Sequence, residues 1–155
     1  MIKLIFFFSL LISSNTFANC KRPNWAFCYK IVNNKCINTR HYILYRDGIN
    51  VKLNHKNIVK SGLWTSFYSN TSLSSPRQIE IDHILPFKFM KDNGGCDRIE
   101  EIYNDEENLV IASKKENRAK SSLLIVPFIT KAPYREKQCK ICNKYKLKNC
   151  NLVCL

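Results

Sequence analysis

Acidic residues are scarce in this chain. The 155 residues include 12 aspartates and glutamates against 25 lysines and arginines, for a formal net charge of +13. Such a basic excess in a small protein favours polyanionic partners, nucleic acid above all, and carries no information about the fold. A chain that is alkaline only for solubility, or one that binds anionic cell-surface polymers, is the alternative interpretation of the charge.

Long apolar runs and internal repeats are also lacking. The apolar run from Leu4 to Ile12 is too short to span a bilayer as an ordinary helix. It follows Lys3 and precedes the small residues of Thr16-Phe17-Ala18, which is typical of a secretory signal peptide. We therefore expect a signal peptide over 1–18, an uncleaved anchor being the alternative. We also expect a single secreted or periplasmic domain over 19–155, without stable membrane association. Cleavage removes one charge, so the mature net charge is 24 − 12 = +12.

Cysteine is present in an even number, and every copy lies after the expected signal peptide. The eight positions are Cys20, Cys28, Cys36, Cys96, Cys139, Cys142, Cys150 and Cys154. In an exported chain this count predicts disulfides, although 105 pairings are open. A four-thiolate zinc site formed by the last four cysteines is the alternative.

The periodicity of the chain predicts an α+β fold. Arg40 to Tyr45 looks strand-like, and the turn signal Asp47-Gly48 separates it from a second strand over 49–53. Residues 78–84 alternate apolar and polar side chains, which is typical of a half-buried strand. The stretch 108–112 is a short apolar strand.

A helix should follow the second of these central strands. Ser113 and Glu116 have the spacing of a capping box, which predicts a helix from Lys114 through Lys120. The stretch 131–155 holds seven basic residues, one acid and half of the cysteines, and we interpret it as a basic, disulfide-rich C-terminal extension.

Three residues in this central region suit phosphodiester hydrolysis. His83 could deprotonate water, because an unperturbed imidazole is largely neutral at pH 7 to 8. Asp82 and Asn117 offer hard oxygen ligands, which favour Mg²⁺, with Mn²⁺ or Ca²⁺ as alternatives. Glu80 shares the strand face of Asp82, where a solvated side chain is the plainer interpretation.

These residues resemble a known family. Ile81-Asp82-His83-Ile84-Leu85-Pro86, Asn108-Leu109-Val110 and Asn117-Arg118-Ala119-Lys120-Ser121 are similar, in this order, to the motif of secreted bacterial HNH endonucleases in its His-Asn-Asn version. The resemblance implies a ββα-metal core over 78–122, with additional N-terminal strands. It implies His83 as general base, Asp82 and Asn117 as ligands of one divalent metal, and Asn108 as the residue that orients the loop bearing His83. The paired Cys-x-x-Cys zinc ligands of many HNH proteins are missing here, since only Cys96 lies inside the motif.

The expected helix is also rich in cations. Lys114, Lys115, Arg118 and Lys120 would contact phosphates without reading sequence. The chain is thus predicted to be a largely nonspecific metal-dependent endonuclease acting on DNA, with RNA as an alternative substrate. A secreted, disulfide-stapled polyanion-binding protein or toxin without nuclease activity is the competing hypothesis. An inhibitor or immunity protein would suit such an enzyme, but no residue indicates one.

Overall fold

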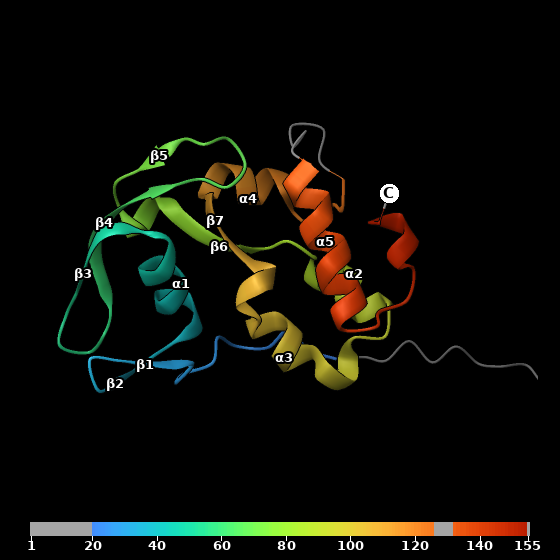
Figure 1. The fold of residues 1–155 in the computed structure, drawn as a ribbon, viewed down its shortest axis with the longest axis horizontal. Helices are drawn as coiled ribbons and strands as arrows, with labels where there is room; N and C mark the ends of the chain where they lie inside the picture. The colour runs from blue at the N-terminus through green and yellow to red at the C-terminus, as the bar shows by residue number, and fades with distance from the viewer. Residues whose placement is uncertain (1–19, 126–131, 155) are drawn as a thin grey trace, which may run out of the picture.

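The fold was analysed in a computed structural model that describes residues 20–125 and 132–154. It is an α+β structure in which small antiparallel sheets alternate with short helices (Figure 1). The expected signal peptide, residues 1–18, lies outside the described residues. In the part of the chain that is described, no helix is long and apolar enough to cross a membrane.

The elements follow one another in a simple order. They are β1 (Lys30–Val32), β2 (Lys35–Ile37), α1 (Thr39–Asp47), β3 (Ile49–Leu53), β4 (Val59–Thr65), β5 (Ser72–Leu73), β6 (Ile79–His83), α2 (Phe87–Asp92), α3 (Ile99–Asn104), β7 (Leu109–Ser113), α4 (Lys114–Lys120) and α5 (Ala132–Lys144). Strands β1 and β2 form a hairpin, and β3, β4 and β5 form a second sheet.

Strands β6 and β7 form the centre of the molecule. They pair antiparallel over five residues, from Ile79 opposite Ser113 to His83 opposite Leu109. Helix α4 begins directly after β7, and Ser113 and Glu116 form the capping box that the sequence predicts. The strand, strand and helix expected over 78–122 are therefore confirmed as elements, within a residue of the expected bounds.

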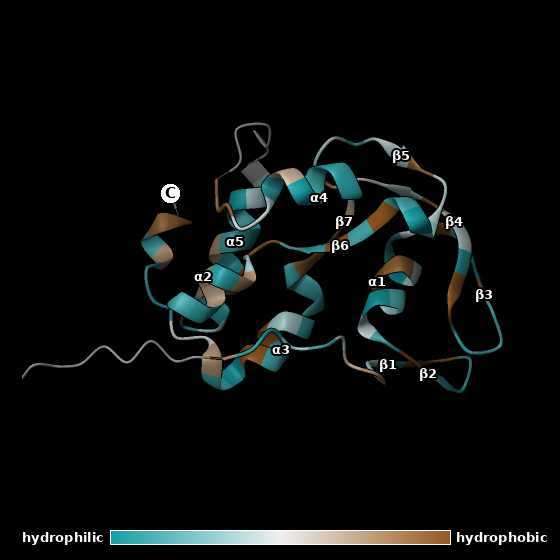
Figure 2. Ribbon diagram, turned by 180° about the vertical axis from the view of Figure 1, so that it is seen from behind, coloured by the Kyte–Doolittle hydropathy of each residue, from teal (hydrophilic) through white to brown (hydrophobic). Residues whose placement is uncertain are grey.

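The two faces of this central pair contact different partners. Ile79, Ile81, Leu109 and Ile111 pack in one cluster with side chains of α1 and β4. On the opposite face, Val110 and Ala112 pack with Tyr68 and with Tyr134 of α5. Figure 2 shows hydrophilic residues along much of α4 and α5 and hydrophobic ones on α1 and α3. The β6–β7 pair is thus a layer between helices, which fixes it firmly.

One expected strand is wrong. Residues 40–45 belong to helix α1, in which Thr39, Ile43 and Leu44 are buried at helical spacing. The Asn38 side chain caps this helix by accepting a hydrogen bond from the backbone N–H of His41 at 2.8 Å. The expected strand at 49–53 does form, as β3, but it pairs with β4 instead.

Residues Gly48 and Trp64 explain why the chain turns sharply after α1. The indole Nε1 of Trp64 donates to the carbonyl of Leu44 at 2.7 Å and locks β4 onto the helix end. A Cβ at Gly48 would lie only 2.4 Å from that nitrogen, so glycine permits the close approach.

All eight cysteines are paired in disulfides, as predicted, and the zinc alternative is excluded. The bonds are Cys20–Cys96, Cys28–Cys36, Cys139–Cys154 and Cys142–Cys150. Two of them tie α5 to the end of the chain. The first bond ties the N-terminal segment to the stretch between α2 and α3. The expected C-terminal extension is therefore covalently cross-linked over its described residues, 132–154.

Candidate functional site

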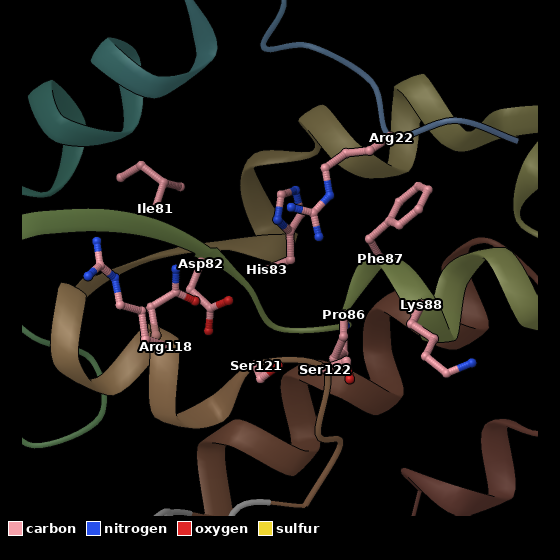
Figure 3. A pocket seen from close by; sticks show the side chains of 11 residues that line it. Arg22, Ile81, Asp82, His83, Pro86, Phe87, Lys88, Arg118, Ser121 and Ser122 are labelled. Carbon is pink, nitrogen blue, oxygen red and sulfur yellow. The ribbon is translucent and has the colours of Figure 1, made fainter.

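A cavity of about 450 Å³ opens at the end of β6 (Figure 3). Asp82 and His83 line it from β6, and Asn117 lines it from α4. The hairpin and helix thereby bring together three residues that lie up to 35 positions apart in the sequence. Positive charge comes from three further lining residues on separate elements: Arg22, Lys88 and Arg118.

The His83 ring is held on its edge and on its face. Its Nε2 lies 2.8 Å from the carbonyl oxygen of Tyr103. A carbonyl can only accept, so Nε2 carries the proton and Nδ1 is the basic nitrogen of the neutral ring. The indole of Trp25 stacks on the imidazole, with centroids 5.4 Å apart and planes 2° from parallel. Burial lowers the pKa of His83 to about 4, which keeps the ring neutral at pH 7.

Asp82 is buried and forms an ion pair with Lys120 of α4. The ammonium of Lys120 lies 3.0 Å from its Oδ2, and the hydroxyl of Tyr68 donates to the same carboxylate. Burial raises the pKa of Asp82, and the nearby Lys120 charge opposes that rise. The Lys120 ammonium also donates to the carbonyl of His83 at 2.8 Å.

The position of Lys120 differs from the sequence expectation. We expected a surface lysine that meets phosphates, but its side chain is fully buried because it neutralises Asp82. The other three cations of that set, Lys114, Lys115 and Arg118, are exposed on α4. Helix periodicity alone could not separate them, because the buried carboxylate that attracts Lys120 lies on another element.

Asn117 is oriented by Glu80. Its Nδ2 donates to the Glu80 carboxylate at 2.9 Å, and Arg118 pairs with the other oxygen of that carboxylate at 3.2 Å. A side-chain amide has one oxygen and one nitrogen, so this bond fixes which end is engaged and leaves the Oδ1 oxygen as the acceptor. Glu80 is therefore a partner of the helix rather than the solvated side chain that we expected.

Asn108 is fully buried behind the site and braces the chain that follows His83. Its Oδ1 accepts from the N–H of Leu85 at 2.9 Å, and its carbonyl accepts from the N–H of Ile84 at 2.8 Å. Its Nδ2 donates to the carbonyl of Ile102 at 3.2 Å. This geometry fits the orienting role that the resemblance implies, because the side chain ties the loop after β6 to α3.

Asp82 and Asn117 are the residues that would hold a hard divalent cation at this cavity. Among the described residues no group of three or more histidine, cysteine, aspartate or glutamate side chains gathers to hold a metal ion. The side-chain oxygens of Asp82 and Asn117 are the candidate donors, because both residues line the cavity. The Asp82 carboxylate already accepts from Tyr68, from Lys120 and from the backbone N–H of His83, so a cation would have to share its oxygens with these groups. One carboxylate and one amide oxygen suit Mg²⁺, which usually keeps several waters. A cation bound here would share Asp82 with the Lys120 ammonium.

Several residues of the site escaped the sequence analysis. Arg22 and Trp25 lie more than 55 positions before His83, and no motif marks them. The only signal near them was Cys20, whose pairing with Cys96 could not be chosen from the sequence. The sequence assigns no role to Tyr68, although its hydroxyl donates to the Asp82 carboxylate.

Comparisons with known proteins identify no family. No protein-family model matches the chain, and no solved structure matches it significantly. An uncharacterized secreted protein of Arthroderma benhamiae is 33% identical over 66 residues. That match covers 43% of this chain and 30% of the relative, so the chain spans less than a third of the length of the protein it matches.

Proposed function

We propose that the protein is a secreted metal-dependent endonuclease that hydrolyses phosphodiester bonds with little regard to sequence. The observation that carries this proposal is the convergence of Asp82, His83 and Asn117 on one cation-lined cavity at the end of β6. DNA is the substrate that we favour, and RNA is the alternative. The order of the residues in the HNH motif adds support.

His83 is the proposed general base. Its ring is neutral at pH 7, and the proton on Nε2 is engaged by the Tyr103 carbonyl. Nδ1 can therefore take a proton from water. A positioned base of this kind contributes roughly 10²–10⁴-fold to a rate. The low pKa makes His83 a weak base but one that stays available far below neutral pH.

Asp82 and Asn117 are the proposed ligands of one divalent ion, most simply Mg²⁺. When bound, the ion would neutralise charge on the phosphate and on the leaving oxygen. The protein's own part is to hold the two oxygens in place. Lys120 and Tyr68 fix the carboxylate, and Glu80 fixes the amide.

The exposed cations around the cavity are the proposed phosphate contacts. Arg22, Lys88 and Arg118 line it from the N-terminal segment, α2 and α4, so they surround it from separate elements. Lys114 and Lys115 extend the positive surface along α4. Side chains of this type bind backbone phosphates without reading bases, which suits nonspecific cleavage.

Three observations support export. Four disulfides in a small protein are typical of an oxidising compartment. The matched relative carries the description of a secreted protein. The N-terminal sequence has the pattern of a signal peptide, so we place the mature protein outside the cytoplasm.

A plasmid-nicking assay tests the function directly. The parent protein should nick supercoiled DNA with Mg²⁺, and EDTA should abolish the reaction until Mg²⁺ is restored. His83→Ala should lose roughly 10²–10⁴-fold in rate while retaining DNA binding. His55→Ala is the matched control, because His55 is exposed and remote from the motif in sequence. Full activity in EDTA would refute the metal, and an active His83→Ala would refute this site.

Metal titrations separate the base from the ligands. Asp82→Ala and Asn117→Ala should raise the Mg²⁺ concentration needed for half-maximal nicking, whereas His83→Ala should lower the rate without moving that midpoint. If the parent binds DNA but never nicks it, the protein is better explained as a disulfide-stapled polyanion-binding protein.

A further inference from the structure

The N-terminal arm, which we define as residues 20–26, lies across the side of the cavity that holds His83. In Figure 3 Arg22 reaches from this arm toward the His83 ring. The arm's Trp25 contacts the same ring by stacking. Among the described residues before β1, Trp25 is the one whose ring contacts the His83 ring. The arm is thus the one N-terminal segment that touches the residues of the proposed reaction in the described part of the chain.

We propose that Trp25 is a positioning residue of the active site, which fixes the plane of the His83 imidazole for proton abstraction. This inference rests on the nuclease function proposed above. It adds a requirement that the HNH-like motif does not contain, because Trp25 lies outside that motif on a separately anchored segment.

The hydrogen bond to the Tyr103 carbonyl does not by itself fix the plane of the His83 imidazole. A single bond from Nε2 to a carbonyl holds one edge of the imidazole, but the ring can still swing about that contact. The ring of Tyr103 contacts one side of the imidazole, with centroids 4.1 Å apart and planes tilted by 38°. The indole of Trp25 supplies the parallel contact, with its plane 2° from that of the imidazole at a centroid separation of 5.4 Å, and so limits the remaining rotation. Offset stacking at this separation is favourable for aromatic pairs. The direction of the Nδ1 lone pair is therefore set by Trp25 and Tyr103 together.

The arm is anchored strongly enough to act in this way. The Cys20–Cys96 disulfide holds one end. At the other end the N–H of Ala26 donates to Asn104 at 2.8 Å, and the carbonyl of Ala26 accepts from the N–H of Thr39 at 3.1 Å. Trp25 lies between these anchors and also contacts the ring of Tyr103, with centroids 5.0 Å apart.

Two substitutions at one position test the role. Trp25→Leu keeps an apolar side chain but removes the flat ring, and it should lower kcat about 10–100-fold, since small misplacements of a reacting group cost this much. KM for DNA should change little, because the phosphate-binding cations are intact. Trp25→Phe restores an aromatic face and should recover most of kcat. Phe27→Ala is the matched control, an aromatic residue two positions along that is 86% exposed.

Chemical labelling gives a readout that does not depend on turnover. Diethyl pyrocarbonate labelling at one neutral pH, mapped by mass spectrometry, reports how accessible each of the three histidines is. His83 should label faster in Trp25→Leu than in the parent and in Trp25→Phe. His55, which is exposed, should label equally in all of them.

The outcomes distinguish this inference from the proposed function. If the parent nicks DNA, His83→Ala does not, and Trp25→Leu keeps the parent kcat, then the inference is wrong and the function stands. Equal loss of kcat in Trp25→Leu and Trp25→Phe would also overturn it, because a ring face alone would not be what matters. Loss of activity with unchanged His83 labelling would overturn it as well.

The disulfide provides a second, independent variant. Cys20→Ser combined with Cys96→Ser should release the arm and reproduce the kcat loss and the faster His83 labelling of Trp25→Leu. Cys28→Ser combined with Cys36→Ser removes the bond of the β1–β2 hairpin, which anchors no part of the arm, and should do neither. Equal kinetics in the two double variants would contradict the anchoring step.

Discussion

The β6–β7–α4 unit and the C-terminal region from α5 onward differ in what accompanies their apolar packing. The first buries polar and charged groups, namely Asp82, His83, Asn108 and Lys120. In the second, Ile141, Cys142 and Leu147 join a large apolar cluster, and two disulfides close the segment. Besides its apolar packing, the unit that carries the proposed chemistry is held by buried hydrogen bonds and a buried ion pair. The flanking region adds covalent cross-links to its apolar burial.

The two regions contribute differently to the free energy of folding. Buried polar groups cost free energy unless every partner is present. Apolar burial and disulfides elsewhere offset such costs. The two regions meet where Tyr134 and Gln138 of α5 donate to the carbonyl of Ile84, directly after His83, at 3.3 and 3.2 Å. The C-terminal region therefore also supports the backbone of the site.

The largest expected effect is at Lys120. Lys120→Met leaves the carboxylate of Asp82 buried without its cation, and breaking a buried pair in this way costs about 3–5 kcal/mol. Arg118→Met removes an ion pair on the same helix, but the arginine side chain is 70% exposed, so the cost should be under about 1 kcal/mol. Urea unfolding of both variants measures the contrast. Equal destabilisation by the two substitutions would contradict the assignment of Lys120 to a buried ion pair and of Arg118 to a solvated one.

The Cys139–Cys154 bond should give the next largest effect. Its cysteines are 15 residues apart, and closing such a loop stabilises a protein by about 3 kcal/mol in the chain-entropy description. Replacing both cysteines with serine should lower the free energy of unfolding by about that amount. The Mg²⁺ midpoint for nicking should stay unchanged, because neither Asp82 nor Asn117 is touched. A shifted midpoint would show that the cross-link shapes the metal ligands as well.

Acid should weaken the two regions in different pH ranges. The folded pKa of His83 is about 4, below its ordinary value of 6.5, so the unfolded chain alone takes up this proton between those values. Stability should therefore fall, by on the order of 2 kcal/mol, as pH drops from 6.5 to 4. Denaturant titrations across pH measure this, and His83→Gln should abolish that part of the pH dependence.

Glu107, which lies just before β7, supplies the comparison for the C-terminal region because it pairs with two lysines of α5. Hydrogen bonds from Lys140 and Lys144 of α5 lower its pKa to about 2, from an ordinary 4.5. Its contribution is present above pH 4.5 and is lost as pH falls toward 2, below the His83 range. Glu107→Gln should remove this lower range only. A single transition that both substitutions move together would contradict the assignment.

The smallest expected effect concerns which positive surface binds DNA. Arg118→Gln, at the cavity, should reduce the slope of log affinity against log salt by about 0.9, the value for one phosphate contact on duplex DNA. Lys146→Gln removes an exposed charge of the C-terminal region and should leave the slope unchanged. Fluorescence anisotropy with one labelled duplex at several salt concentrations measures this slope for each variant. If Lys146→Gln reduced the slope and Arg118→Gln did not, the C-terminal region would be the surface that binds DNA.

The elements of the central unit could be predicted from the sequence because their signals are local. Alternation over 78–84 and the Ser113–Glu116 box each involve residues a few positions apart. The strand expected at 40–45 failed because aromatic and β-branched residues favour strands. There the Asn38 cap and the burial of Ile43 and Leu44 on one helix face decided the outcome.

The composition of the site was less accessible to prediction, because its remaining parts depend on tertiary contacts. From the sequence, Lys120 cannot be distinguished from a surface lysine, because its burial depends on the ion pair with Asp82 of another element. Arg22 lines the cavity and Trp25 stacks on His83, and the segment that carries both is tied down by a cross-link between residues 76 positions apart. Sequence spacing identifies residues that share an element, whereas these contacts require the fold to be known.

The Cys20–Cys96 bond has a consequence for the cell that makes the protein. Thiols of this kind stay reduced in the cytosol and are oxidised after export. In the role proposed for Trp25, a chain still in the cytosol would lack a fixed arm and hence a properly aimed base. Its capacity to cut the producer's own nucleic acid would remain low until the chain had left.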